Sequence, residues 1–225
     1  MLWTIKNGHL TFGQLLFLFG TYALLLLVML PVHEAAHAFV AHKLGDDTAK
    51  WNGRLTLNPL RHLDPIGSIM LVVFGIGYAK PVPVDPHNFR RCSRKTGMAL
   101  TALAGPLSNL LMAVLSMAVF RVIYSFTTSV AVLLYADLVL LGVLVPINIG
   151  LAVFNLLPIP PLDGSRIFGA ILPDKWTAWV DRYFQIVQLA LFALIVSGAL
   201  DVLLNFLRST VGNLLCWIFA LPSLY

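Results

Sequence analysis

"TFGQLLFLFGTYALLLLVMLPVHEAAHAFVAHKLG", residues 11–45, is an almost unbroken apolar run with polar groups gathered near its end. The run predicts one long helix over 11–44, and Gly45 directly after it is a typical helix stop. About 20 apolar residues cross a bilayer, so a helix of this length spans the membrane and either protrudes or tilts. This stretch therefore places the chain among membrane proteins, so the lipid bilayer is part of the solvent for the rest of the sequence.

The composition of the whole chain agrees with a membrane protein. Of its 225 residues, 59% are hydrophobic and 11% are charged. In a soluble domain, about half of the residues are hydrophobic and about a quarter are charged. We expect one integral multi-pass domain over residues 1–225. In so apolar a chain, the formal charge of +5 indicates cytoplasmic loops and anionic lipid headgroups, and we expect no nucleic-acid partner. The two cysteines, Cys92 and Cys216, are too far apart for a thiolate metal cluster.

The remaining apolar runs predict an all-α polytopic membrane protein with about four main transmembrane helices. The region over 46–90 holds "IGSIMLVVFGIGYAKPVPVDP", which is too rich in glycine and proline for a spanning helix. We expect a re-entrant β-hairpin or loop there, buried in protein or lining a wet cavity. The other predicted elements are a helix over 97–123, a helix over 130–157, a turn over 158–166, a helix over 184–204, and an apolar segment over 211–221 that enters the membrane only in part.

Basic residues are concentrated between the first two predicted helices, which sets the expected orientation. Positive charge marks cytoplasmic loops, so this region faces the cytoplasm, and so does the turn after the third helix. We expect the plasma (inner) membrane and a site open toward its cytoplasmic side. The basic residues are Lys43, Lys50, Arg54, Arg61, Lys80, Arg90, Arg91, Arg94 and Lys95.

The polar groups in the first helix form the pattern His33-Glu34-x-x-His37. Residues four apart share a helical face, so two imidazoles can hold one zinc ion while Glu34 exchanges protons with a water bound to it. Taken alone, the pattern is about as often a coincidence as a site. However, Glu34 is the only glutamate in the chain, and ionisable groups inside membrane helices are usually functional.

A third zinc ligand has to be an aspartate or another histidine, because no second glutamate exists. Asp163 in "PPLDG" is the best candidate, since it follows the third predicted helix on the cytoplasmic side. Asp-Gly is also ordinary turn chemistry, so the dipeptide alone does not decide. Asn148 and Asn155 are seven residues apart and share a helical face. Their amides suit either helix packing or hydrogen bonding to an oxyanion.

Four stretches together resemble the site-2 protease family of intramembrane zinc metalloproteases. The resemblance implies one zinc ion per chain, held by His33, His37 and Asp163. It also implies that Glu34 acts as general base and then acid, and that Asn155 polarises the scissile carbonyl. The stretches, in the family's order, are "HEAAH" at 33–37, "RLTLNPLRHLDPIG" at 54–67, "AGPLSN" at 104–109 and "FNLLPIPPLDG" at 154–164.

The resemblance further implies an endopeptidase that cuts within or beside transmembrane segments of substrate proteins. "GIGYAKPVPV", residues 75–84, resembles the family's re-entrant hairpin, whose exposed edge can pair with an unwound substrate. The candidate residues that position substrate are Asn148, Gly75, Gly77 and Pro81.

Other interpretations stay open at this point. The same ligands suit a metal transporter or sensor, although the repeats typical of transporters are missing. An inactive scaffold that binds helices is a third possibility. The sequence assigns no role to His62 or Asp64, and it predicts neither oligomeric state nor regulation. The chain contains no inserted PDZ or regulatory domain, so it resembles a minimal core of the family.

Overall fold

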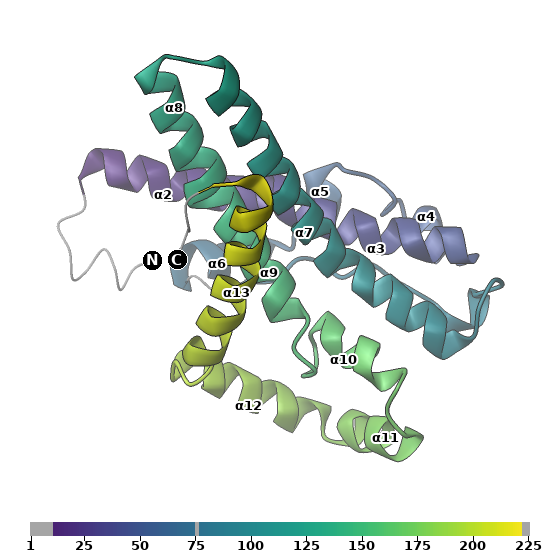
Figure 1. Cartoon of the computed structure of the whole chain (residues 1–225). Coiled ribbons are helices and arrows are strands. Elements are labelled where there is room, and N and C mark those ends of the chain that lie inside the picture. The colour runs from purple at the N-terminus through teal and green to yellow at the C-terminus, as the bar shows by residue number, and fades with distance from the viewer. Residues whose placement is uncertain (1–10, 75–76, 222–225) are drawn as a thin grey trace. The chain divides into compact units, whose positions relative to one another are not determined.

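The computed structural model describes residues 11–74 and 77–221 of the chain (Figure 1). The chain divides into two compact units, Met1–Gly97 and Met98–Tyr225. Within the described residues, four helices are long and apolar enough to cross a membrane, as expected. They are Phe12–Leu44, Arg94–Phe126, Val130–Asn155 and Asp201–Phe219.

The first unit begins with the long helix that residues 11–44 predict. It runs without interruption through α2 (Phe12–Leu24), the π-helical segment η1 (Leu25–Met29) and α3 (Leu30–Leu44). Pro31 lies in the first turn of α3, where its missing N–H would break regular α-helical hydrogen bonding. The wider π-helical turn directly before it accommodates this defect. The helix ends at Gly45, whose φ of 108° is a left-handed conformation that favours glycine.

Short elements fill the rest of the first unit. Asn58 and Asp85 cap two of them by accepting hydrogen bonds from backbone N–H groups with their side chains. Both are residue types that favour helix starts and turns. The elements are α4 (Thr48–Trp51), α5 (Pro59–His62), α6 (Pro65–Phe74) and the 3-10 helix η2 (Pro86–Asn88).

The β-hairpin expected within 46–90 is not found among the described residues, which leave out 75–76. Its apolar half is helix α6, and pairing is limited to one antiparallel bridge between Leu63 and Ala79. The physical reason lies in the second half, where Pro81 and Pro83 lack the N–H groups that a strand ladder needs. The expected hairpin is therefore not confirmed, and the described residues form a helix followed by an extended segment.

The second unit contains α7 (Arg94–Phe126), apart from its first turn, and a second composite helix. The composite helix consists of α8 (Val130–Ala136), the π-helical η3 (Asp137–Leu144) and α9 (Val145–Asn155). Helix α13 packs along α9, as the yellow and green helices of Figure 1 show. The remaining helices are α10 (Asp163–Gly169), α11 (Asp174–Arg182), α12 (Phe184–Val196) and α13 (Asp201–Phe219).

The apolar core of the second unit lies between these long helices. Met117 of α7, Ile149 of α9 and Leu204 of α13 are among its buried members. Each comes from a different helix, so the core holds α9 between neighbours through burial of apolar surface. This packing fixes the position of the residue at the end of α9, Asn155, within its unit.

The helix expected over 184–204 is wrong in its boundaries. The structure has two helices there, with α12 ending at Val196 and α13 starting at Asp201. Gly198 adopts a φ of 72°, a left-handed conformation that breaks a helix. As a consequence, the apolar segment over 211–221, expected to enter the membrane only in part, belongs mostly to a 19-residue helix.

Candidate metal centre

His33 and His37 lie one turn apart on α3, and both side chains are buried. Their Nε2 atoms are 3.0 Å apart, and their rings meet edge to face with centroids 4.7 Å apart. Two histidine nitrogens bound to one tetrahedral zinc ion lie about 3.3 Å apart, given Zn–N distances of about 2.0–2.1 Å. The observed separation therefore fits a shared metal ion, and the donors are of a type that zinc accepts.

Glu34 projects from the same turn of α3 and is half-buried. Its Oε2 atom accepts a hydrogen bond of 3.3 Å from the backbone N–H of Val82. A carboxylate offers about four lone-pair positions, so this contact orients the group and leaves it able to accept a proton. Helical spacing and one backbone donor thus place a base beside the two histidines.

Asp163 is the first residue of α10 and is half-buried in the second unit. An acidic residue is favoured in a first helical turn, where the helix dipole is positive. Gly164 follows it and packs directly against the end of α9, because a Cβ atom there would collide with the carbonyl oxygens of Leu156 and Leu157. Only glycine allows this approach, so the Asp-Gly pair brings the carboxylate close to the end of α9.

Asn148 and Asn155 both lie on α9, and each amide donates a hydrogen bond back to its own helix. The Nδ2 atom of Asn155 donates to the Leu151 carbonyl at 3.0 Å, and that of Asn148 to the Leu144 carbonyl at 2.8 Å. Asn148 is fully buried, and its Oδ1 atom has no hydrogen-bond partner in the part of the chain that the structure describes. Each Nδ2 carries a second hydrogen that is available to another acceptor.

The structure gives different results for the three residues of the first unit that were expected to position substrate. Gly75 lies outside the described residues. Gly77 packs backbone to backbone against α6, since a Cβ there would collide with the carbonyl oxygen of Gly67. Pro81 is exposed and lies next to Val82, the donor to Glu34. Pro81 therefore lies beside the candidate base. Gly77 is explained by its close packing against α6, without any contact to a substrate.

Structural roles emerge for two residues that the sequence leaves unassigned. His62 is fully buried, and its Nε2 atom is 2.8 Å from the Thr56 carbonyl oxygen. The Asp64 carboxylate accepts a hydrogen bond of 2.8 Å from the N–H of Gly67 and so caps the start of α6. The first contact ties the end of α5 to the segment before it, and the second stabilises the turn between α5 and α6.

Asp46, one residue after the helix stop at Gly45, is a buried polar residue that the sequence analysis missed. Its carboxylate is completely buried and accepts hydrogen bonds from Thr48, from Asn88 and from the Asp85 N–H. Burial raises the pKa of Asp46, but the hydrogen bonds from Thr48, Asp85 and Asn88 outweigh it and hold the pKa below its ordinary value. A signal was present in "GDDT", where an Asp two residues before a Thr can close a turn.

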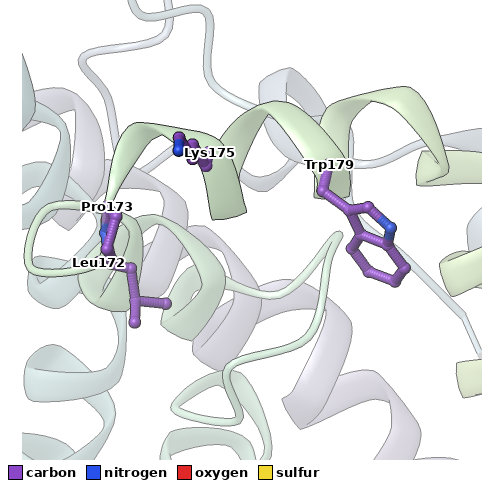
Figure 2. A pocket seen from close by; sticks show the side chains of 4 residues that line it. All are labelled: Leu172, Pro173, Lys175 and Trp179. Carbon is purple, nitrogen blue, oxygen red and sulfur yellow. The ribbon is translucent and has the colours of Figure 1, made fainter.

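A surface depression in the second unit does not resemble a catalytic site. It has a volume of about 490 Å³, and Figure 2 shows its lining, with Leu172 and Pro173 before α11 and Lys175 and Trp179 on it. None of these four residues is a typical zinc ligand, and none is a histidine or a carboxylate. The candidate residues lie on α3 in the first unit, which carries the histidines and Glu34, and on α9 and α10 in the second, which carry the asparagines and Asp163.

Comparison with known proteins points to one family. The model of Peptidase family M50 matches residues 129–198, which contain Asn148, Asn155 and Asp163. The chain is 41% identical over 171 residues to "Putative zinc metalloprotease YwhC" of Bacillus subtilis, covering 74% of this chain and 77% of that protein. No solved structure matches the chain.

More distant relatives carry the same kind of name. The chain is 34% identical over 152 residues to "Putative zinc metalloprotease Rip2" of Mycolicibacterium smegmatis, covering 65% of this chain and 54% of that protein. It is 30% identical over 151 residues to "Putative zinc metalloprotease MJ0611" of Methanocaldococcus jannaschii, covering 66% and 65%. The chain thus spans about half to two thirds of the length of these two relatives.

Proposed function

The chain belongs to peptidase family M50, the site-2 protease family of zinc metalloproteases, and from this premise we propose that it is an intramembrane endopeptidase. Its cofactor is zinc, and it is an integral membrane protein, with four apolar helices among residues 11–74 and 77–221 that are long enough to span a bilayer. The proposed reaction is hydrolysis of peptide bonds within or beside transmembrane segments of substrate proteins. The observation that carries this proposal is the chain's single glutamate, held beside two buried histidines in a membrane helix.

We assign His33, His37 and Asp163 as the ligands of one zinc ion. The histidines offer imidazole nitrogens and Asp163 offers a carboxylate oxygen, and three protein ligands are typical of catalytic zinc sites. When bound, zinc supplies Lewis-acid chemistry that polarises a carbonyl group and makes water more acidic. The 3.0 Å separation of the two imidazole nitrogens supports the pairing of the histidines on one ion.

Glu34 is the proposed general base and acid. Its carboxylate takes a proton from the attacking water and later gives that proton to the leaving amine, as the broken peptide bond releases a carboxylate and an amine. The hydrogen bond from Val82 keeps the carboxylate in one orientation during these transfers. A glutamate is suited to this role because it is a stronger base than the amide oxygen that would replace it in a glutamine.

Asn155 is the proposed donor to the oxygen of the scissile carbonyl. Its amide has one hydrogen on the Leu151 carbonyl and a second that is available to an oxyanion. A fixed donor of this kind stabilises negative charge that develops in the transition state. We further propose that Pro81 and its neighbours lie along the substrate, and that the site opens toward the cytoplasmic side of the plasma membrane.

A cleavage assay with Glu34→Gln tests the proposal. Candidate single-pass membrane proteins are incubated with wild type and with the variant in liposomes, and products are separated by electrophoresis. We expect Glu34→Gln to lose at least about 100-fold in turnover, the scale of a lost general base, while it retains helical content and zinc. Full activity of Glu34→Gln would contradict the assigned mechanism.

A further inference from the structure

Residues 79–85, "AKPVPVD", form an extended segment that we call the strap, and the structure attaches it to α5, to α3 and to the segment that follows α3. Going beyond the proposed function but resting on it, we propose that Asp46 is a positioning residue for Glu34 and acts through the strap. The contacts that carry this inference all lie within the first unit, Met1–Gly97.

The carboxyl end of the strap is held by Asp46. The Oδ2 atom of Asp46 accepts a hydrogen bond of 2.8 Å from the N–H of Asp85, the last residue of the strap. The Oδ1 atom accepts from the side chain of Asn88 at 3.2 Å and from the N–H of Thr48 at 2.9 Å. Asp46 is 0% exposed, so its buried charge is satisfied from two sides: by Thr48 on its own segment, and by Asp85 and Asn88 at and just after the end of the strap.

The amino end of the strap is held independently. The N–H of Lys80 donates to the carbonyl oxygen of His62 at 2.8 Å, and Ala79 forms the bridge with Leu63. His62 is itself fully buried. The strap therefore has two separate end attachments, one at α5 and one at Asp46, two residues after the end of α3.

The middle of the strap contacts the candidate base. Val82 donates its N–H to Glu34, while its buried side chain packs against Ala38 and Ala49. Pro81 and Pro83 on either side have no N–H, so Val82 is the one backbone donor between them. Proline at 83 also favours an extended conformation at Val82, which keeps this donor directed to one side.

These contacts give Asp46 a role at a distance from the reacting atoms. A glutamate side chain has several rotatable bonds and loses entropy when it is oriented. The Val82 N–H selects one orientation only if the strap stays in place, and Asp46 holds the end of the strap next to Val82. Removal of the Asp46 anchor should therefore loosen the Val82 contact and leave the His62 attachment intact.

Amide hydrogen exchange tests the inference without any substrate. Because residues 81 and 83 are prolines, the strap's last six residues have only four backbone amides, those of Lys80, Val82, Val84 and Asp85. In Asp46→Asn we expect exchange at Asp85 and Val82 to be at least about tenfold faster, since a hydrogen bond to a charged group is lost. Exchange at Lys80 should stay as in wild type.

Two further variants serve as controls. Asp47→Asn makes the same chemical change one residue along, where the carboxylate pairs with His42 and not with the strap, so all four amides should exchange as in wild type. Asn88→Ala removes one donor to Asp46 and should make amide exchange at Val82 and Asp85 about threefold faster. This milder variant replaces Asp46→Asn in the test if Asp46→Asn does not fold.

Two outcomes would overturn the inference. In the first, Val82 exchanges at the wild-type rate in Asp46→Asn. In the second, amide exchange at Lys80 is accelerated as much as exchange at Val82. That result would show a general loss of stability rather than a specific role of Asp46 in positioning Glu34. Both outcomes are measured in the absence of proteolysis, so they are independent of the proposed function.

An activity measurement adds a second readout. With a substrate that wild type cuts and Glu34→Gln does not, Asp46→Asn should lower kcat by at least about tenfold, with KM and zinc content unchanged. A normal kcat would contradict a positioning role. Absence of cleavage by wild type would count against the proposed function, and the exchange result would still decide the role of Asp46.

Discussion

His33, Glu34 and His37 occupy one turn of α3, where helical spacing alone brings the two imidazoles within 3.0 Å of each other. Asp163 is different, because it begins α10 in another unit of the chain. Its assignment as a zinc ligand rests on the type of its donor atom and on the family. A variant of Asp163 is therefore the most informative single substitution for the metal centre.

We expect Asp163→Ala to weaken zinc binding by at least about 100-fold, because even the loss of a residue that only supports a ligand costs 10–100-fold in affinity. Zinc content after dialysis and competition with a chelator measure the effect. Asp201→Ala, which removes an exposed carboxylate from the start of α13 in the same unit, should bind zinc as wild type does. Equal affinity in Asp163→Ala and wild type would assign the third ligand to another residue.

At the scale of elements, the two helices that carry the candidate residues share one construction. In each, a π-helical segment is followed by an α-helix with proline in its first turn: η1 before Pro31, and η3 before Pro146. His33 and Asn148 each follow their proline by two residues. Because proline cannot donate to the preceding turn, a wider π-turn relieves the defect, and π-turns often lie at functional sites.

The contact between α9 and α10 should depend on Gly164. A methyl group there would collide with two carbonyl oxygens, so we expect Gly164→Ala to destabilise the protein by about 2 kcal/mol or more. Thermal unfolding in detergent measures the effect. Gly142→Ala is the matched control, because a Cβ at Gly142 meets an atom only at 3.6 Å. The control should be neutral or slightly stabilising, and equal losses in both variants would contradict the packing argument.

The Asp46 anchor should make stability depend on pH. Hydrogen bonds hold the pKa of Asp46 below its ordinary value in the folded state. Its contribution is therefore complete above the ordinary value of about 4 and is lost as the pH falls through the folded value. Thermal unfolding between about pH 3 and pH 7 should show this loss in wild type. Asp46→Asn should be less stable near neutral pH by about 1–3 kcal/mol and should lose less on acidification; an identical pH dependence would contradict the assignment.

On the scale of the whole molecule, the bilayer sets the requirements. In the described part of the chain, four helices are long and apolar enough to span it, and their exposed apolar side chains suit a lipid environment rather than water. Six basic residues lie between the end of the first helix at Leu44 and the start of the second at Arg94, and by the positive-inside rule we expect this region to face the cytoplasm.

Cysteine labelling in intact cells checks this orientation. With Cys92 and Cys216 replaced by serine and alanine, single substitutions Trp51→Cys and Phe126→Cys provide sites that are 74% and 86% exposed. An impermeant maleimide should label Phe126→Cys from outside, and should label Trp51→Cys only after the membrane is permeabilised. The reverse pattern would invert the orientation and place the proposed site on the outer face.

Helix boundaries were predictable where a single local signal decides them. The apolar run and Gly45 define the first long helix, and the structure places its end at Leu44. The prediction over 184–204 is wrong because composition there is apolar throughout, so the break depends on the left-handed conformation of Gly198. The expected hairpin is not confirmed for a similar reason, since glycine and proline suggest a turn without excluding the short helix α6.

By itself the sequence determined the membrane class, the two histidines proposed to bind zinc and the candidate base, because hydropathy and helical spacing are local properties. The tertiary structure decided how Glu34 is oriented. The Val82 N–H comes from a residue 48 positions along the chain, and Asp46 and His62 keep it in place. Such contacts depend on the packing of segments that are distant in sequence. Local residue patterns therefore do not predict which backbone N–H group donates to which carboxylate.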